Sequence, residues 1–318
     1  MENKLKEVLI KKILENIPTN VKPVNYLTDI LDLGRESVYR RLNGQIDFSL
    51  AEIVKLSNEL EFSLNEIHSE YDKNLAAFEF FRDRLISPEQ SFKSMLEAFY
   101  ERMVAVSNAK DKHTDLAINR LLGSLALQYN NLYKFVFYKW IHQFDKVPLN
   151  YYYSDLEVSD ELANLAQRAS YYQKRLDKTI VLDENILYNT IQEVKYYQER
   201  ELIKEEEVAL IKSDLVLLLE RLETVLDTGV SMYGTKWEIY LCSINVCSNA
   251  TCLDYDGKVS SSFWIHSDAA ISTSDRQVYK LQKEWIESLK KYSALITQSN
   301  QKMQAEFLNQ QYKYLDEF

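Results

Sequence analysis

Glycine and proline are scarce in this chain, with 6 and 4 occurrences in 318 residues. Average usage of about 7% and 5% would place roughly 22 glycines and 16 prolines in a chain of this length. These two residues form most tight turns and interrupt helices. Their scarcity therefore favours long helices and predicts a mainly α protein.

Length, composition and charge narrow the class of protein further. The length exceeds that of one typical domain, so we expect two domains, and 46% hydrophobic residues are typical of a globular chain. A net charge of −10 argues against a surface that as a whole wraps nucleic acid or an anionic membrane. No apolar run approaches the roughly 18 residues of a membrane span, and the start, MENKLKEVLIKK, lacks the apolar core of a secretion signal. We expect a cytoplasmic protein with no membrane partner.

The first 70 residues carry the signals of several short helices. Apolar residues at helical spacing predict one helix over 5–17 and another from about 24 to 31. The segment Asp32-Leu33-Gly34 then predicts a sharp turn. The next helix, 35–42, is expected to stop at Asn43-Gly44, because glycine after a helix end adopts the left-handed conformation easily.

Two later helices begin with capping boxes, Ser49-Leu50-Ala51-Glu52 and Ser63-Leu64-Asn65-Glu66. Two short helices joined by a three-residue turn, with flanking helices to bury them, are the layout of a helix-turn-helix unit. The run from Leu27 to Ile67 resembles the phage-repressor (XRE/Cro-like) class of helix-turn-helix transcription regulators, in which the recognition helix ends at an Arg/Asn-Gly step and a Ser-Leu-opened helix follows. The sequence departs from that pattern at the turn, where Asp32 stands in place of the usual glycine.

The resemblance implies that residues 35–42 are a recognition helix that enters the major groove of DNA. The residues then expected to contact DNA are Arg35, Glu36, Tyr39, Arg40, Arg41 and Asn43. The first four would face base edges, where arginine pairs with guanine and glutamate with cytosine. Arg41 and Asn43 would lie nearer the phosphate backbone. The alternative is that the three arginines only solvate the helix surface and pair with Asp32 and Glu36.

Residues 71–88 are expected to form a connecting helix or linker, and residues 89–318 a helical domain. Apolar stripes predict helices over 89–108, 114–144, 158–177, 184–202 and 205–228. Around 237–265, β-branched and aromatic residues with the turn signal Asp256-Gly257 predict a β-hairpin. The predicted fold is therefore an N-terminal helix-turn-helix domain of four to five helices (1–70), followed by a helical bundle with a small antiparallel β insertion. A repeated Tyr-Tyr-Gln leaves a helical repeat array open as an alternative.

A final helix is expected from Ser274, as its cap, toward the end of the chain. Its apolar stripe runs from Val278 through Trp285 and Ile296 to Phe307, beyond the part that a compact bundle would cover. An uncovered stripe commonly finds a partner, and one short recognition helix reads only a few base pairs. We therefore predict a homodimer held by the C-terminal domain. The alternative is that this helix packs back on its own bundle.

Residues typical of catalysis and metal binding are not grouped in the sequence. The four histidines are far apart, the three cysteines are spaced by five residues rather than two, and no phosphate-binding glycine loop is present. We expect no enzyme, no metal and no other cofactor. The predicted function is a sequence-specific transcription regulator on double-stranded DNA, with a small-molecule or peptide effector left open by the 22 tyrosines. The alternative is a protein-interaction or scaffold module that does not bind DNA.

Overall fold

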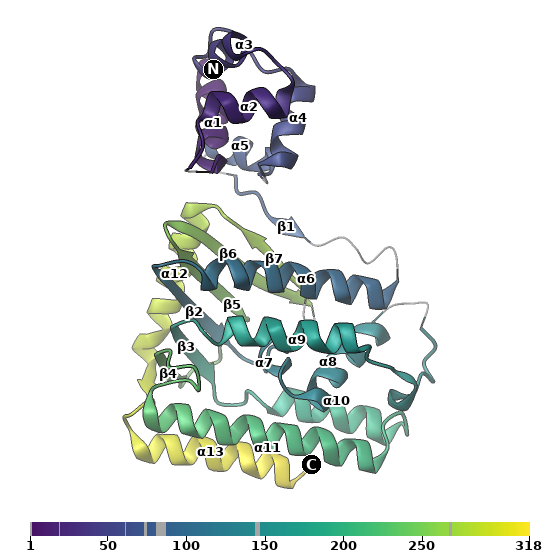
Figure 1. Cartoon of the computed structure of the whole chain (residues 1–318). Coiled ribbons are helices and arrows are strands. Elements are labelled where there is room, and N and C mark those ends of the chain that lie inside the picture. The colour runs from purple at the N-terminus through teal and green to yellow at the C-terminus, as the bar shows by residue number, and fades with distance from the viewer. Residues whose placement is uncertain are drawn as a thin grey trace. The chain divides into compact units, whose positions relative to one another are not determined.

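The computed structural model describes residues 2–18, 20–60, 62–72, 75–80, 87–143, 147–266 and 269–318. The chain divides into two compact units (Figure 1). One consists of Met1–Phe78 with Thr273–Asp275, and the other of Glu79–Ser272 with Arg276–Phe318.

The described part of the N-terminal unit contains five helices. These are α1 (Glu2–Asn16), α2 (Pro23–Leu31), α3 (Arg35–Leu42), α4 (Leu50–Glu59) and α5 (Leu64–Tyr71). They enclose an apolar core in which Ile13, Leu27, Val38 and Leu56 are fully buried. The positions predicted for the short N-terminal helices are therefore confirmed to within a few residues.

Local contacts explain where these helices begin and end. The first predicted capping box is formed: the Ser49 hydroxyl accepts a hydrogen bond from the Glu52 amide at 3.2 Å, and the Glu52 carboxylate accepts one from the Ser49 amide at 2.7 Å. The turn before α3 places the left-handed conformation on Asp32 (φ 54°), while Gly34 is extended. Gly44 after α3 is left-handed (φ 70°), which is the helix stop that the sequence predicts.

The second unit is organised around a mixed β-sheet, of which the described residues form eight strands. The strands are β1 (Glu79–Phe80), β2 (Lys112–Ile118), β3 (Lys178–Asp183), β4 (Trp237–Cys242), β5 (Ala250–Tyr255), β6 (Lys258–His266), β7 (Ala269–Thr273) and β8 (Ser293–Leu295). Their order in the sheet is β1-β7-β6-β5-β2-β3-β4-β8. The central strands β2, β3 and β4 are parallel, and β5 and β8 flank them in antiparallel orientation.

Helices cover both faces of this sheet unequally. The helical elements are α6 (Pro88–Ser107), α7 (Gly123–Ala126), α8 (Asn130–His142), η2 (Tyr153–Asp155), α9 (Asp160–Gln173), α10 (Tyr188–Glu199), α11 (Glu205–Thr228), α12 (Arg276–Leu289), η3 (Lys290–Tyr292) and α13 (Gln301–Asp316). Alternate strand residues such as Leu116 and Ile180 join the large core with α6 to α11 and α13, whereas Ala117 and Val181 pack with α12 on the other face (Figure 1). Among the helices that the structure describes, none combines the length and the apolar character of a membrane span.

The predicted fold class, mainly α with a small β insertion, is wrong for the second unit. Residues expected to begin a helix over 114–144 lie in β2, and β3 occupies the gap between the expected helices 158–177 and 184–202. Both strands are covered on their two faces, and each contains only three consecutive apolar residues, 116–118 and 180–182, which periodicity alone does not separate from buried helix. The predicted hairpin at Asp256-Gly257 is confirmed as the β5–β6 connection, but it belongs to the large sheet.

Two connecting segments also differ from the predictions. Residues 75–80, expected to lie in a connecting helix or linker, contain no helix and end in β1. The expected final helix is divided into α12, β8 and α13: η3 follows α12, and Gln298 and Asn300 adopt left-handed conformations between β8 and α13. The side chains of Phe307 and Leu308 on α13 are buried in the large core. This part of the apolar stripe is therefore covered by its own chain, as in the alternative that the helix packs back on its own bundle.

Candidate functional site

Helix α3 is fixed in the N-terminal unit by one face only. Val38 is 0% exposed and packs in the same core as Leu27 and Leu31 of α2. Residues on the opposite side of the helix are spaced by three or four positions and point away from that core. The succession of α2, the turn 32–34 and α3 therefore presents one face of α3 to solvent.

The exposed face of α3 and the residue that caps its end carry five of the six residues predicted to contact DNA. The exposed side chains are those of Arg35, Glu36, Tyr39, Arg40 and Asn43. Tyr39, at 57% exposure, is a large aromatic side chain with little contact to its own unit. Because residues four apart share a face of a helix, Arg35 lies beside Tyr39 and Glu36 beside Arg40.

Arg41 is placed differently from its five neighbours in the predicted site. Its guanidinium forms a bidentate ion pair with the Glu52 carboxylate, at 3.0 and 3.1 Å, and donates to the Ser37 hydroxyl at 2.7 Å. Burial alone would raise the pKa of Glu52, but hydrogen bonds from the Ser49 amide and from Arg41 hold it below the ordinary value. The Arg41 side chain therefore ties α3 to the start of α4 and is not presented to a phosphate.

Several other cations of this unit are engaged in ion pairs. Lys6 pairs with Asp47 and Lys12 with Glu66. Among the residues that the structure describes, Arg35 and Arg40 have no carboxylate at ion-pair distance. The expected alternative, in which these two arginines pair with Asp32 and Glu36, therefore does not occur among the described residues.

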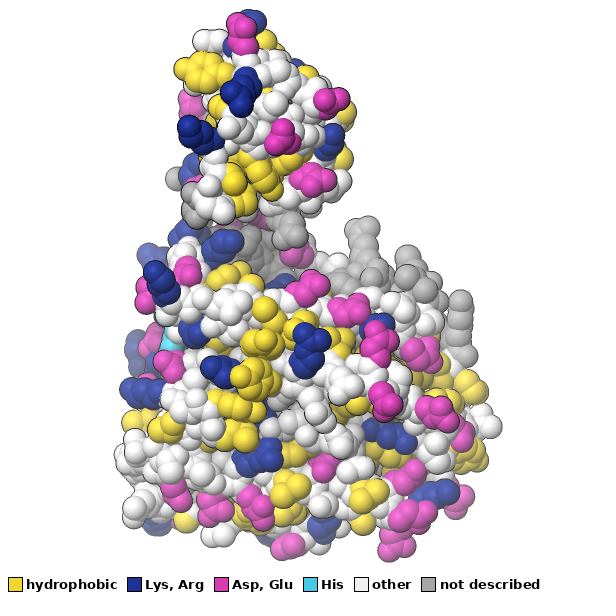
Figure 2. Space-filling model, viewed as in Figure 1, with side chains coloured by type: hydrophobic (Ala, Val, Ile, Leu, Met, Phe, Trp, Pro, Cys, Tyr) yellow, Lys and Arg dark blue, Asp and Glu magenta, His cyan; other side chains and the backbone are white. Residues whose placement is uncertain are grey.

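The free arginines give this surface a defined chemistry. A guanidinium donates two parallel hydrogen bonds to the O6 and N7 atoms of guanine or to a phosphate. Glu36 on the same face accepts from a cytosine amino group and repels a phosphate. Basic and acidic side chains are mixed on the face of this unit that Figure 2 shows, so electrostatic attraction to a DNA backbone would be modest.

The second unit contains a cavity of about 330 Å³ between its sheet and the helices α6 to α9. Its volume lies in the range of small-molecule sites. Most of its walls are apolar, including Phe92, Leu96, Phe99, Leu116, Val136 and Leu253. Lys178 Nζ, Gln173 Oε1 and Thr114 Oγ1 are buried polar atoms in its lining that have no hydrogen-bond partner among the described residues.

Lys178 is the most unusual of these groups. The residue is 2% exposed, and its ammonium lies 4.1 Å from the centre of the Trp237 ring. Burial, and then the nearby charge of Lys174, lower its pKa to about 7. Sequence patterns did not indicate this residue. The single local signal is a lysine placed two positions before the apolar run Ile180-Val181-Leu182.

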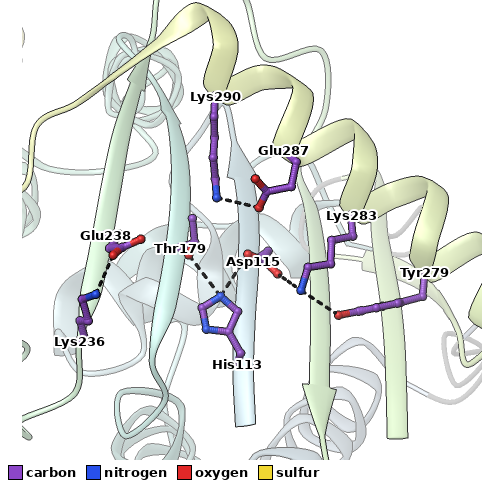
Figure 3. A network of polar contacts seen from close by, with 9 residues as sticks. All are labelled: His113, Asp115, Thr179, Lys236, Glu238, Tyr279, Lys283, Glu287 and Lys290. Atoms are coloured by element: carbon purple, nitrogen blue, oxygen red, sulfur yellow. Dashed lines mark hydrogen bonds and ion pairs between the residues drawn. The ribbon is translucent and has the colours of Figure 1, made fainter. Parts of the chain in front are cut away.

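A polar network on the α12 side of the sheet joins Asp115 to neighbouring groups (Figure 3). His113 Nε2 lies 3.1 Å from Asp115 Oδ1 and 3.2 Å from the Thr179 hydroxyl, and Lys283 Nζ lies 3.3 Å from Asp115 Oδ2. Burial alone would raise the pKa of Asp115, but His113 and Lys283 hold it below the ordinary value. One imidazole nitrogen serves both partners, so the ring does not link a nucleophile to an acid through its two nitrogens as in a catalytic triad.

No metal site is found in the described ranges, because no three His, Cys, Asp or Glu side chains lie close enough together to hold an ion. All three cysteines are free thiols, with Cys242 and Cys252 buried. Comparisons of the chain with protein-family models, with curated proteins and with solved structures gave no match.

Proposed function

We propose that this protein is a sequence-specific DNA-binding transcription regulator that acts in the cytoplasm, with α3 entering the major groove. The observation that carries the proposal is the exposed face of α3, where Arg35 and Arg40 point to solvent without an ion-pair partner among the described residues. A helix that follows a short turn, is anchored by one buried residue and carries free arginines has the features of a recognition helix.

The proposal includes a homodimer. Two free arginines and Tyr39 on one eight-residue helix form few contacts, so one copy would bind DNA weakly at physiological salt. Two linked copies raise the effective concentration of the second contact and restore affinity. This argument concerns affinity alone and assigns the interface to no particular surface.

The test compares two variants that each remove one exposed charge from the N-terminal unit. Arg40→Ala changes α3, and Lys55→Ala changes an exposed lysine on α4 that, in the described part of the chain, has no ion-pair partner. Duplexes enriched by the parent protein from a random pool are used to measure affinity at several salt concentrations. We expect Arg40→Ala to cost about 1 to 3 kcal/mol on the enriched sequence and to relax its base preference at one or two positions. Lys55→Ala should lower affinity for all duplexes alike or not at all.

Two results would contradict the proposal. The first is a random pool from which the folded protein enriches no sequence, which is the outcome that a protein-interaction module predicts. The second is a folded Arg35→Ala/Arg40→Ala double variant that keeps the parent's affinity and base preference, because the assigned helix face would then not be the one in contact with DNA.

A further inference from the structure

The cavity of the second unit has walls that suit an apolar molecule. About 330 Å³ corresponds to the volume of roughly ten water molecules. Aromatic and aliphatic side chains from α6, α8 and β2 form most of its surface. Apolar walls bind water poorly, and a void leaves their atoms without contacts on one side. An organic molecule with about ten to fifteen non-hydrogen atoms fits such a space.

The three unpartnered polar atoms are not scattered over the walls. Thr114 and Lys178 are paired residues in the neighbouring parallel strands β2 and β3, so their side chains lie next to each other on one face of the sheet. Gln173 is the last residue of α9, shortly before β3 in the chain. Buried polar groups are almost always hydrogen-bonded in folded proteins. A lysine, a threonine and a glutamine lining one cavity without partners therefore mark a place for a polar group of a ligand.

The charges of the neighbouring side chains indicate the charge of the ligand's polar group. No carboxylate among the described residues pairs with Lys178, and the ammonium of Lys174 is also buried without a hydrogen-bond partner. Removing an ammonium from water is costly unless an opposite charge compensates it. Lys174 does not line the cavity, but its charge reaches Lys178, and the two cations give this end of the cavity a positive potential that favours an anion.

We propose that the cavity binds a small carboxylic acid with an apolar body, whose carboxylate accepts hydrogen bonds from Lys178 Nζ and the Thr114 hydroxyl while the apolar part lies against α6 and α8. The Gln173 side-chain oxygen then accepts a hydrogen bond from the Lys178 ammonium or from a hydroxyl group of the acid. This site is independent of DNA binding, because the cavity lies wholly within the second unit.

Calorimetric titration of the full chain tests this proposal with a panel of carboxylic acids of eight to twelve carbons, straight-chain and aromatic, each paired with its primary alcohol. We expect at least one acid to bind at least tenfold more tightly than its alcohol. Lys178→Met should reduce the affinity for that acid at least tenfold and leave the affinity for the alcohol unchanged or higher. Thr114→Val keeps a side chain of similar shape and should reduce the affinity for the acid by a smaller factor. Lys258→Met changes an exposed lysine outside the cavity and should have no effect.

The proposal is overturned if no acid of the panel binds more tightly than its alcohol. It is also overturned if folded Lys178→Met and Thr114→Val both bind the acid as the parent does. Thermal unfolding and circular dichroism of each variant establish that it is folded. Retained sequence-specific DNA binding would show that a failure here leaves the proposed function intact.

Discussion

Replacement of Lys178 by methionine removes a buried ammonium and keeps a side chain of similar length. In the parent, burial lowers the pKa of this lysine from 10.5 to about 7. Because the folded-state pKa lies below the unfolded-state value, the unfolded chain binds more protons between pH 7 and about 10. The stability of the second unit should therefore rise with pH over this range and be lowest below pH 7.

The size of the pKa shift gives the free-energy cost of burying the Lys178 ammonium. Each pKa unit corresponds to about 1.4 kcal/mol, so a shift of three to four units costs up to about 5 kcal/mol near neutral pH. The face of the Trp237 ring, 4.1 Å from the ammonium, favours the charged form and opposes this cost, so 5 kcal/mol is an upper bound. We expect Lys178→Met to stabilise the second unit by up to about 5 kcal/mol at pH 7. It should also reduce the pH slope of stability by roughly 1 kcal/mol per pH unit between pH 7 and 9. The slope that remains includes Lys174 and Lys134, whose pKa values are lowered in the same direction, and Cys252, whose raised pKa acts in the opposite direction.

Urea unfolding followed by tryptophan fluorescence measures this effect in the full chain. All four tryptophans, Trp140, Trp237, Trp264 and Trp285, belong to the second unit, so the signal reports on that unit alone. Lys258→Met serves as the control, because it removes an exposed lysine and should leave stability and its pH slope unchanged. A Lys178→Met variant that is less stable than the parent at pH 7, or that keeps the parent's full pH slope, would refute the reasoning, since the ammonium would then have a partner or water around it.

Four further predictions concern the packing within each unit and the oligomeric state. Val38→Asp places a carboxylate in the fully buried core position of α3 and should destabilise the N-terminal unit by at least about 3 kcal/mol; amide hydrogen exchange in residues 2–72 like the parent's would show that α3 is oriented differently. Arg41→Ala leaves Glu52 without its bidentate partner and should cost about 2 kcal/mol in the same unit, and an unchanged denaturation midpoint would contradict this role. A chain truncated after Ile296 loses α13 and should expose the large core and aggregate. Full-length protein should scatter light as a dimer at micromolar concentration, and a monomer would contradict the homodimer.

Local signals made the N-terminal unit predictable. The Ser49 and Ser63 capping boxes and the Asn43-Gly44 stop act within four residues of the positions that they define, so the sequence window contains the whole interaction. The hairpin at Asp256-Gly257 is predictable for the same reason, because both left-handed residues lie in the turn itself. The exposure of Arg35 and Arg40 follows from the phase of helix α3 alone, which the local sequence gives. The ion pair between Arg41 and Glu52 joins two helices, so the local sequence did not predict it.

The scarcity of glycine misled the prediction for the second unit. Left-handed positions that usually favour glycine are occupied by Glu201, Gln298 and Asn300, so chain reversals occur without the expected signal. Strands β2 and β3 pair across about sixty residues of sequence, Thr114 with Lys178, and no local pattern encodes that pairing. The orphaned ammonium of Lys178 depends on what the whole fold places around it, and for this reason only the structure reveals it.

Site-specific photo-crosslinking tests the central claim most directly, namely that α3 is the surface in contact with DNA. A benzophenone amino acid replaces Tyr39 on α3 in one variant and Leu64 in another; Leu64 is an exposed apolar residue of α5, which lies at the opposite end of the same unit from α3 (Figure 1). Each protein is irradiated with the duplex that the parent enriches from a random pool. The account predicts a crosslink from position 39 to a base within the enriched sequence and none from position 64. A crosslink from position 64 without one from position 39 would contradict it, as would a chain that enriches no duplex.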